Sequence, residues 1–268
     1  MTAYEARDIS LVITTHQSPD RLRWVLESVS WQDQKPLEVI VADDGSDPNT
    51  RNVVLQYQKH LSVRLLHSWQ PDSSFRLARS RNLALSKARG SWMVFIDGDC
   101  VMPPDFVSSQ CSVANDSCLV FGSRKLLGEL DTKELLLGQP SLSRLNHYLT
   151  GRKFWKLPVG PFRTWPRRTW RNVKGFMMAA SRRDFLAIGG FDESFDSWGL
   201  EDSDFAVRAS RFGLKFLDSK YKTSLVHLYH PEPNKIQKSK NDGAFRSLLS
   251  EPNRFLPSNT SIPEASVS

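Results

Sequence analysis

The sequence predicts an α/β protein with a Rossmann-like, mixed but mainly parallel sheet flanked by helices. Two observations predict it: the first hundred residues alternate apolar runs with segments of helical periodicity, and polar or acidic residues directly follow the runs. Strands that alternate with helices pair in parallel through right-handed crossovers. Ligands bind such sheets beyond the carboxyl ends of the strands. The pattern therefore also predicts the edge at which a site forms.

Each element follows from its local pattern. In the first half, apolar runs predict strands at 9–14, 37–42, 63–67 and 92–96, and helical spacing predicts helices at 21–30, 53–57 and 75–87. In the second half we expect strands at 118–123, 175–181, 215–217 and 224–229, and helices after Pro103-Pro104, at 183–188 and at 201–212. The region from 124 to 174 reads as helical and then irregular. The end, from Pro231, reads as a polar tail with one short helix at 244–249.

Composition narrows the class of protein. With 268 residues, 40% hydrophobic and 24% charged, the chain fits a globular protein with a sizeable core. The net charge of +7 favours an anionic partner, and leaves nucleic acid, anionic lipid and a phosphorylated substrate open. The three cysteines form no C-x-x-C pair, which argues against structural zinc and fits a reducing compartment.

The chain shows no targeting or membrane-spanning signal. The apolar run at 9–13 is too short for the core of a signal peptide. No stretch approaches the ~18 apolar residues that a membrane span needs. We therefore expect a cytoplasmic protein, with any membrane contact peripheral and on the inner face.

The first acidic cluster is Asp97-Gly98-Asp99, a D-x-D directly after an apolar strand. Carboxylates are the ligands that Mg²⁺ prefers, together with substrate phosphates, and Mn²⁺ also accepts imidazole. The glycine between the acids permits a sharp turn and close approach of a ligand. A solvated turn is the alternative. The strand before it favours a site for Mn²⁺ or Mg²⁺.

The second acidic cluster, Glu201-Asp202, opens an expected helix about a hundred residues later and follows Trp198-Gly199-Leu200. Acids at a helix start are stabilised by the helix dipole, so capping is one interpretation. The other is a general base beside an aromatic wall, because a carboxylate becomes competent when it is partly desolvated and aimed at a hydroxyl. Spacing alone leaves both open.

Several motifs together resemble the GT-A family 2 glycosyltransferases, which are inverting and use nucleotide sugars. In the family's order they are Leu11-Val12-Ile13-Thr14, Val41-Ala42-Asp43-Asp44-Gly45-Ser46, Ser80-Arg81-Asn82, Asp97-Gly98-Asp99, Gly189-Gly190-Phe191-Asp192, Trp198-Gly199-Leu200-Glu201-Asp202 and Tyr229-His230-Pro231. The resemblance covers roughly residues 8–232. It is strongest to the branch with a W-G-x-E-D motif, which includes chondroitin-polymerase and galactosyltransferase-like domains. Leu200 stands where the second glycine of that motif is common.

The resemblance implies a donor side. Thr14 and Asp44 are expected to contact the nucleoside, with Asp43 as the alternative to Asp44. Arg81 is expected near the diphosphate or ribose, and Arg76 either assists it or is a surface charge. Asp97 is expected to serve both the nucleotide and the metal. Asp99 is the more direct metal ligand, and His230 the third, with His227 as its competitor.

The resemblance also implies an acceptor side. Asp202 is expected to act as the general base, and Glu201 assists it. Glu201, Trp198 and Gly199 are expected to position the sugar, and the turn at Gly189–Asp192 is expected on the same side. As a single GT-A domain, residues 1–232 would divide into a nucleotide-binding half, 1–100, and an acceptor half, 101–232, before a tail at 233–268.

The implied function is transfer of a sugar, with UDP the favoured nucleotide, to a glycan or lipid-linked glycan in bacterial polysaccharide or lipopolysaccharide synthesis. The main alternative is a catalytically inactive glycosyltransferase-like protein that binds nucleotide or glycan. A nucleotidyltransferase would not need the W-G-x-E-D element. A nucleic-acid-binding module is disfavoured because the acidic clusters would repel phosphates, so no nucleic-acid partner is expected.

One further segment, 151–174, contains eight Lys or Arg residues and no acid, interleaved with aromatic residues. Aromatic and basic residues together suit an anionic membrane interface. A loop over the acceptor site and a solvated surface are the two alternatives.

Overall fold

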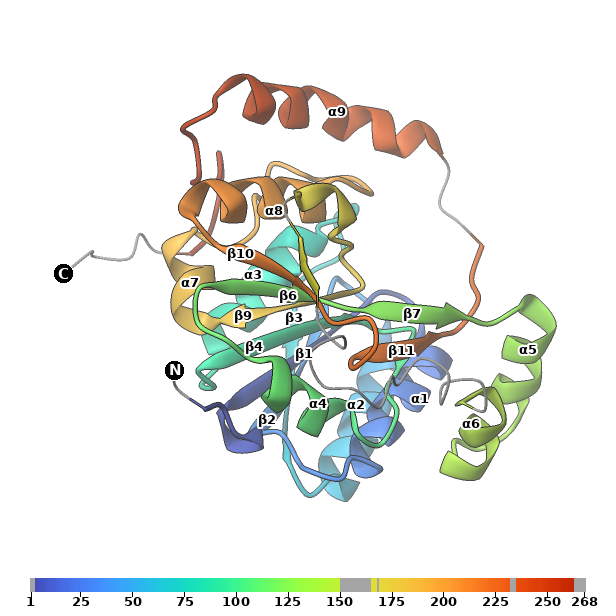
Figure 1. Ribbon diagram of the computed structural model, residues 1–268. Helices are drawn as coiled ribbons and strands as arrows, with labels where there is room; N and C mark the ends of the chain where they lie inside the picture. Colours follow the sequence, from blue (N-terminus) through green and yellow to red (C-terminus); the bar gives the residue numbers. More distant parts are fainter. Residues whose placement is uncertain (1–2, 150–164, 168, 232–234, 263–268) are drawn as a thin grey trace.

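A central eight-stranded sheet organises the protein (Figure 1). The computed structural model describes residues 3–149, 165–167, 169–231 and 235–262. Four strands lie side by side and parallel, in the order β3 (Arg64–Trp69), β2 (Glu38–Asp43), β1 (Ile9–Thr15) and β4 (Trp92–Asp97). The sheet continues through β9 (Met177–Ser181), β6 (Cys118–Phe121), β10 (Lys215–Asp218) and β8 (Trp165–Arg167). Because β9 and β8 run antiparallel to their neighbours, the sheet is mixed, and the predicted fold class is confirmed.

Helices cover both faces of the first four strands. On one face, α1 (Pro19–Ser30) and α2 (Pro48–His60) pack against Leu11 and Ile13. On the other face, α3 (Leu77–Lys87) packs against Val12. All seven residues of β1 are buried, because successive side chains point to opposite faces and both faces are covered. The strands therefore read as continuous apolar runs.

Five further α-helices follow α3 among the described residues up to 231. They are α4 (Phe106–Val113), α5 (Glu129–Leu137), α6 (Leu142–Leu149), α7 (Arg182–Ala187) and α8 (Glu201–Phe212), with short 3₁₀ turns η1 (Ala6–Asp8) and η4 (Trp170–Asn172). None of the helices in the described ranges is both long and apolar enough to cross a bilayer. Most of the basic segment 151–174 lies outside the described residues, so its contact with lipid stays a prediction.

A small second sheet lies beside the strand ends. In it β11 (Ser224–His227) pairs parallel with β7 (Ser123–Leu126) and antiparallel with β5 (Cys100–Val101). The single strand predicted at 118–123 is therefore wrong in extent: the chain passes from β6 into β7, and so from one sheet to the other, at Gly122. A side chain added at Gly122 would meet the Thr223 carbonyl oxygen at 2.6 Å, so glycine permits this crossing.

The end of the chain is more ordered than the sequence predicts. The short helix expected at 244–249 is part of α9 (Lys235–Ser250), which has 16 residues. The chain then returns to the body, where Ile262 is only 4% exposed and joins the core beside Phe191 (Figure 1). A single buried apolar residue leaves no periodic pattern in the sequence, so the return of this segment to the core could not be predicted. A domain boundary at residue 232 stays a prediction.

Candidate active site

A cleft with two lobes lies at the carboxyl ends of the parallel strands. The first lobe, about 350 Å³, is lined by Thr14, Asp44, Asp99 and residues of 15–21. The second lobe, about 290 Å³, is lined by residues that include Arg81, Arg124, Lys174, Gly175, Glu201 and Asp202. Both lobes share Phe75, Leu77, Asp97, Trp198 and His230. The predicted strand-end residues and the second acidic cluster therefore line one continuous site.

Arg81 joins the two acidic clusters. It lies on α3, is 1% exposed, and its Nη1 is 3.3 Å from Glu201 Oε1 while its Nη2 is 3.4 Å from Asp97 Oδ1. Nη2 also donates to the carbonyl of Gly175, at 3.1 Å. Because one buried guanidinium contacts acids 16 and 120 positions away in the sequence, the D-x-D motif and the W-G-x-E-D motif are parts of the same site.

Asp97 is held at the boundary between the lobes. Its Oδ1 accepts a hydrogen bond from the Thr14 hydroxyl, at 3.3 Å, in addition to its contact with Arg81. Burial, and then the neighbouring charge of Asp99, raise the pKa of Asp97. The next position must be glycine, because a Cβ on Gly98 would lie 2.2 Å from the carbonyl oxygen of Thr14. The D-x-D turn therefore packs directly on the end of β1.

Asp99 faces two histidines. Its Oδ2 is 3.1 Å from His230 Nε2 and 3.5 Å from His227 Nε2. Burial alone would raise the pKa of Asp99, but the neighbouring imidazoles of His227 and His230 hold it below its usual range. The hydrogen bond to Asp99 in turn raises the pKa of His230. From the sequence, His227 and His230 were alternatives for one metal-ligand position, whereas the structure brings both to Asp99.

This Asp-His-His cluster fits a divalent cation. One ligand atom from each of the three residues lies within 4.8 Å of the others. Apart from its 3.5 Å approach to Asp99, the buried His227 Nε2 makes no hydrogen bond within the described part of the chain, so its hydrogen-bonding capacity is not met by normal geometry. Carboxylate oxygen with imidazole nitrogen suits Mn²⁺ well. Asp97, also predicted as a metal ligand, lines the cleft but does not belong to this cluster.

The start of α8 presents the second acidic pair. Asp202 Oδ2 accepts from the backbone N–H of Gly175, at 2.8 Å, and Oδ1 accepts from that of Ser203, at 2.7 Å. Glu201 is turned inward to Arg81, and burial, followed by the charge of Asp202, raises its pKa to about 7. The two adjacent acids therefore differ although both line the second lobe: backbone N–H groups hold Asp202, whereas Glu201 is buried and contacts Arg81.

The turn before α8 is conformationally strained. Leu200 caps the helix with φ of +75°, in the left-handed region that favours glycine, and Gly199 before it has φ of +91°. The predicted sugar-positioning residues Trp198 and Gly199 both line the second lobe, and Trp198 also lines the first. Leucine at position 200, where relatives with this motif commonly have glycine, therefore adopts a backbone conformation that costs free energy.

The acidic loop after β2 divides into two roles. Asp44 lines the first lobe, and its carboxylate accepts from the Arg76 backbone N–H at 2.7 Å and from Gln70 Nε2 at 2.5 Å. Burial raises its pKa. Asp43 instead is buried away from the lobe, where it pairs with His67 at 2.8 Å. Burial opposes ionisation of Asp43, but hydrogen bonds from His67 and Ser46 lower its pKa.

Two predicted donor residues are therefore not brought to the cleft. Asp43 is occupied by His67, and the guanidinium of Arg76 donates to the carbonyl of Pro71. Neither residue lines either lobe. What Arg76 contributes is its backbone N–H to Asp44, a contact that a sequence reading based on side-chain charge does not reveal.

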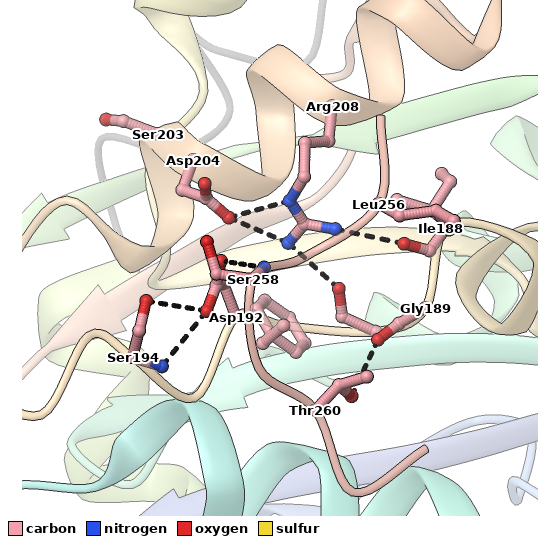
Figure 2. Close-up of polar contacts among 12 residues, drawn as sticks. Ile188, Gly189, Asp192, Ser194, Ser203, Asp204, Arg208, Leu256, Ser258 and Thr260 are labelled. Carbon is pink, nitrogen blue, oxygen red and sulfur yellow. Dashed lines mark hydrogen bonds and ion pairs between the residues drawn. The ribbon is translucent and has the colours of Figure 1, made fainter. Parts of the chain in front are cut away.

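The Gly189–Asp192 turn, expected on the acceptor side, faces the C-terminal segment instead. Figure 2 shows Arg208 of α8 paired with Asp204 and donating to the carbonyl of Ile188. The Arg208–Asp204 distance is 2.7 Å, and Arg208 also donates to the carbonyl of Gly190. Asp192, fully buried, accepts from the backbone of Ser258 at 2.6 Å and from the Ser194 hydroxyl (Figure 2). This turn therefore ties α8 to residues 254–260.

Sequence reasoning missed three contributors to the cleft. Gly175 supplies the N–H that orients Asp202, Arg124 lines the second lobe from β7, and Phe75 lines both lobes. Gly175 shows no local motif, and its contact with Asp202 spans 27 residues. Phe75 was placed at the start of a helix, but an aromatic residue there has no signature of its own.

Comparison with known proteins places this site in a family. The family model described as glycosyl transferase family 2 matches residues 10–171, and the model described as the N-terminal domain of galactosyltransferase matches residues 163–231. Hyaluronan synthase from Pasteurella multocida is 27% identical in an alignment 246 residues long that covers 84% of this chain and 24% of that protein. Chondroitin synthase from Escherichia coli is 27% identical in an alignment 251 residues long that covers 84% of this chain and 35% of that protein. The chain thus spans about a quarter to a third of these relatives.

Solved structures agree on the fold. TarS from S. aureus superposes with a TM-score of 0.59 and 18% identity, over 84% of this chain and 37% of TarS. The mannosyltransferase PcManGT from Pyrobaculum calidifontis superposes with a TM-score of 0.56 and 17% identity, over 92% of this chain and 69% of PcManGT. These confirm the GT-A fold expected from the motifs. With the family model matching more than half of its residues, this chain belongs to glycosyl transferase family 2.

Proposed function

We propose that this chain transfers a sugar, with inversion, from a UDP-sugar to a hydroxyl of a glycan or lipid-linked glycan acceptor. The observation that carries the proposal is the Arg81 bridge between Asp97 and Glu201, because it unites a donor side and an acceptor side in one cleft. The names of the synthase relatives support a role in bacterial polysaccharide or lipopolysaccharide synthesis. TarS structures with UDP and UDP-GlcNAc support UDP, whereas PcManGT was solved with GDP-Man.

The first lobe is the proposed nucleotide site. Asp44 is buried with its carboxylate already oriented by Gln70 and the Arg76 backbone, so it is preorganised to accept a further hydrogen bond from a base N–H. Thr14 lies beside it at the end of β1. Residues with fixed orientation lose little entropy when they bind a ligand, which favours tight recognition of the nucleoside.

Asp99, His227 and His230 would hold the divalent cation, Mn²⁺ or Mg²⁺. When bound, the cation supplies positive charge next to the departing diphosphate. Asp97 stands two residues before Asp99 and contacts both the Thr14 hydroxyl and the Arg81 guanidinium, which supports a role for Arg81 at the same centre. Arg81 is therefore proposed to orient the acids at the reacting centre, and charge at this centre is stabilised best by groups that need no rearrangement.

Asp202 is the proposed general base. The acceptor oxygen attacks the anomeric carbon, its proton passes to the Asp202 carboxylate, and the bond from the anomeric carbon to the diphosphate breaks. The backbone N–H groups of Gly175 and Ser203 hold both oxygens of Asp202 in place for this transfer. Glu201, with its pKa of about 7, is proposed to hydrogen-bond a sugar hydroxyl, with Trp198 against the sugar face.

The test uses nucleotide release from a panel of UDP-, GDP- and dTDP-sugars, with Mn²⁺, Mg²⁺ or EDTA, and calorimetric UDP binding beside it. We expect metal-dependent release from one UDP-sugar. Asp202→Asn should lose at least about a hundredfold in turnover, the scale of a general base, and keep its affinity for UDP. Asp196→Asn, an exposed acid six residues earlier, is the matched control. Near-normal turnover of Asp202→Asn would refute the base assignment. UDP binding without any release would favour the inactive binding protein.

A further inference from the structure

We propose that Arg124 and Lys174 form a subsite for an anionic group of the acceptor, a carboxylate or a phosphate. Both residues line the second lobe and neither lines the first. The inference rests on the proposed function, because it names a chemical property of the acceptor that this lobe would receive.

Arg124 is held in place without an acidic partner. Its guanidinium carbon lies 4.6 Å from the centre of the Phe176 ring, and Phe176 is itself only 9% exposed. Its backbone is fixed by the pairing of β7 with β11, in which Arg124 faces Leu225. Stacking on an aromatic face leaves the N–H groups at the guanidinium edge free to donate. Within the described ranges, Arg124 forms no ion pair.

Lys174 stands beside the catalytic acids. The next residue, Gly175, donates its N–H to Asp202 at 2.8 Å and accepts from Arg81 at 3.1 Å through its carbonyl. The backbone at Lys174 is therefore anchored to the proposed base. Its side chain is exposed, and no acid among the described residues pairs with it.

The acids of the second lobe are already engaged elsewhere. Arg81 contacts Asp97 and Glu201, and backbone N–H groups hold Asp202. The charges of Arg124 and Lys174 in the same lobe thus have no ion-pair partner among the described residues and are left for a ligand. Guanidinium and ammonium groups bind carboxylates and phosphates through charge-assisted hydrogen bonds. Since the donor diphosphate is proposed to lie at the Asp-His-His cluster, the anion that these cations receive belongs to the acceptor.

The experiment compares three small probes by ligand-observed NMR titration: methyl β-D-glucuronide, glucose 6-phosphate and the neutral methyl β-D-glucoside. Each is titrated with and without saturating UDP and Mn²⁺. We expect at least one charged probe to bind about fivefold or more tightly than the neutral probe, the scale of a solvent-accessible ion pair. The carboxylate and phosphate arms identify which anion is preferred. The preference should shrink between low salt and about 1 M salt, because salt screens the pairs.

The variant Arg124→Gln/Lys174→Gln should lose this preference and keep its affinity for the neutral probe. Arg51→Gln removes an exposed charge on α2 that lines neither lobe, and should keep the preference. Equal or undetectable binding of charged and neutral probes would overturn the inference, as would a preference that survives in the double variant. Weaker UDP binding in the double variant would also overturn it, because the cations would then serve the donor. If the wild-type protein binds UDP and turns over a nucleotide sugar, the proposed function stands whatever the probes show.

Discussion

Removal of the Arg81 guanidinium should destabilise the protein through the acids that it leaves behind. Arg81 is 1% exposed and the Glu201 side chain 8%, so solvent screens this pair little. Loss of one partner of a buried pair costs roughly 3–5 kcal/mol. Asp97, at 29% exposed, adds less because water reaches it. We expect Arg81→Met to lower the free energy of unfolding at pH 8 by about 3 kcal/mol.

A double-mutant cycle assigns that cost to Glu201. Glu201→Gln in the Arg81→Met background removes the unpaired charge. It should restore about 1–2 kcal/mol of the free energy of unfolding, a coupling typical of residues in contact. At pH 5 the coupling should nearly vanish, since Glu201, with a pKa of about 7, is then protonated in all forms that carry it. Urea unfolding of the four proteins at both pH values measures it. Additive effects at pH 8, or equal coupling at both pH values, would refute the reasoning.

Three further predictions follow from single residues. Folding raises the pKa of Glu201 from 4.5 to about 7, so the free energy of unfolding of the wild-type protein should fall as pH rises through this range. In urea unfolding, the stability of Glu201→Gln relative to the wild type should therefore increase by about 2–3 kcal/mol from pH 4.5 to pH 8. A difference that stays constant with pH would contradict this. Leu200→Gly should be about 1 kcal/mol more stable than Leu200→Ala, which keeps the left-handed strain, and the opposite order would exclude strain at this position. His227→Ala should weaken calorimetric Mn²⁺ binding by at least about tenfold while the exposed control His60→Ala binds normally; unchanged affinity would remove His227 from the metal cluster.

Much of the site could be located from the sequence because its residues follow strands. Thr14, Asp44, Asp97 and Asp99 come at or just after the ends of apolar runs, and parallel strands bring such ends to one edge. Asp43 shows where this reasoning fails. It occupies the last position of β2, next to Asp44, but alternate residues point to opposite sides, and only Asp44 reaches the lobe.

Contacts across the fold explain the other failures. The Gly189–Asp192 motif was expected near the acceptor, yet its role depends on Ser258 and Arg254, which sequence reasoning assigned to a polar tail. Hydrogen bonds of that kind leave no apolar periodicity. The same holds for α9, because a helix of mostly polar sequence gives a weak helical pattern.

By itself, the sequence determined the alternation of strands and helices, the positions of the acidic clusters and the family that they resemble. Each of these depends on spacing within a few residues, which sets local conformation and strand-end position. Only the tertiary structure decided that Arg81 joins the two clusters, that the pairing of β5 with β11 brings His227 beside Asp99, and that Gly175 holds Asp202. These contacts join residues that are far apart along the chain, and they form only because sheet pairing and packing fix the distances between elements that no local pattern encodes.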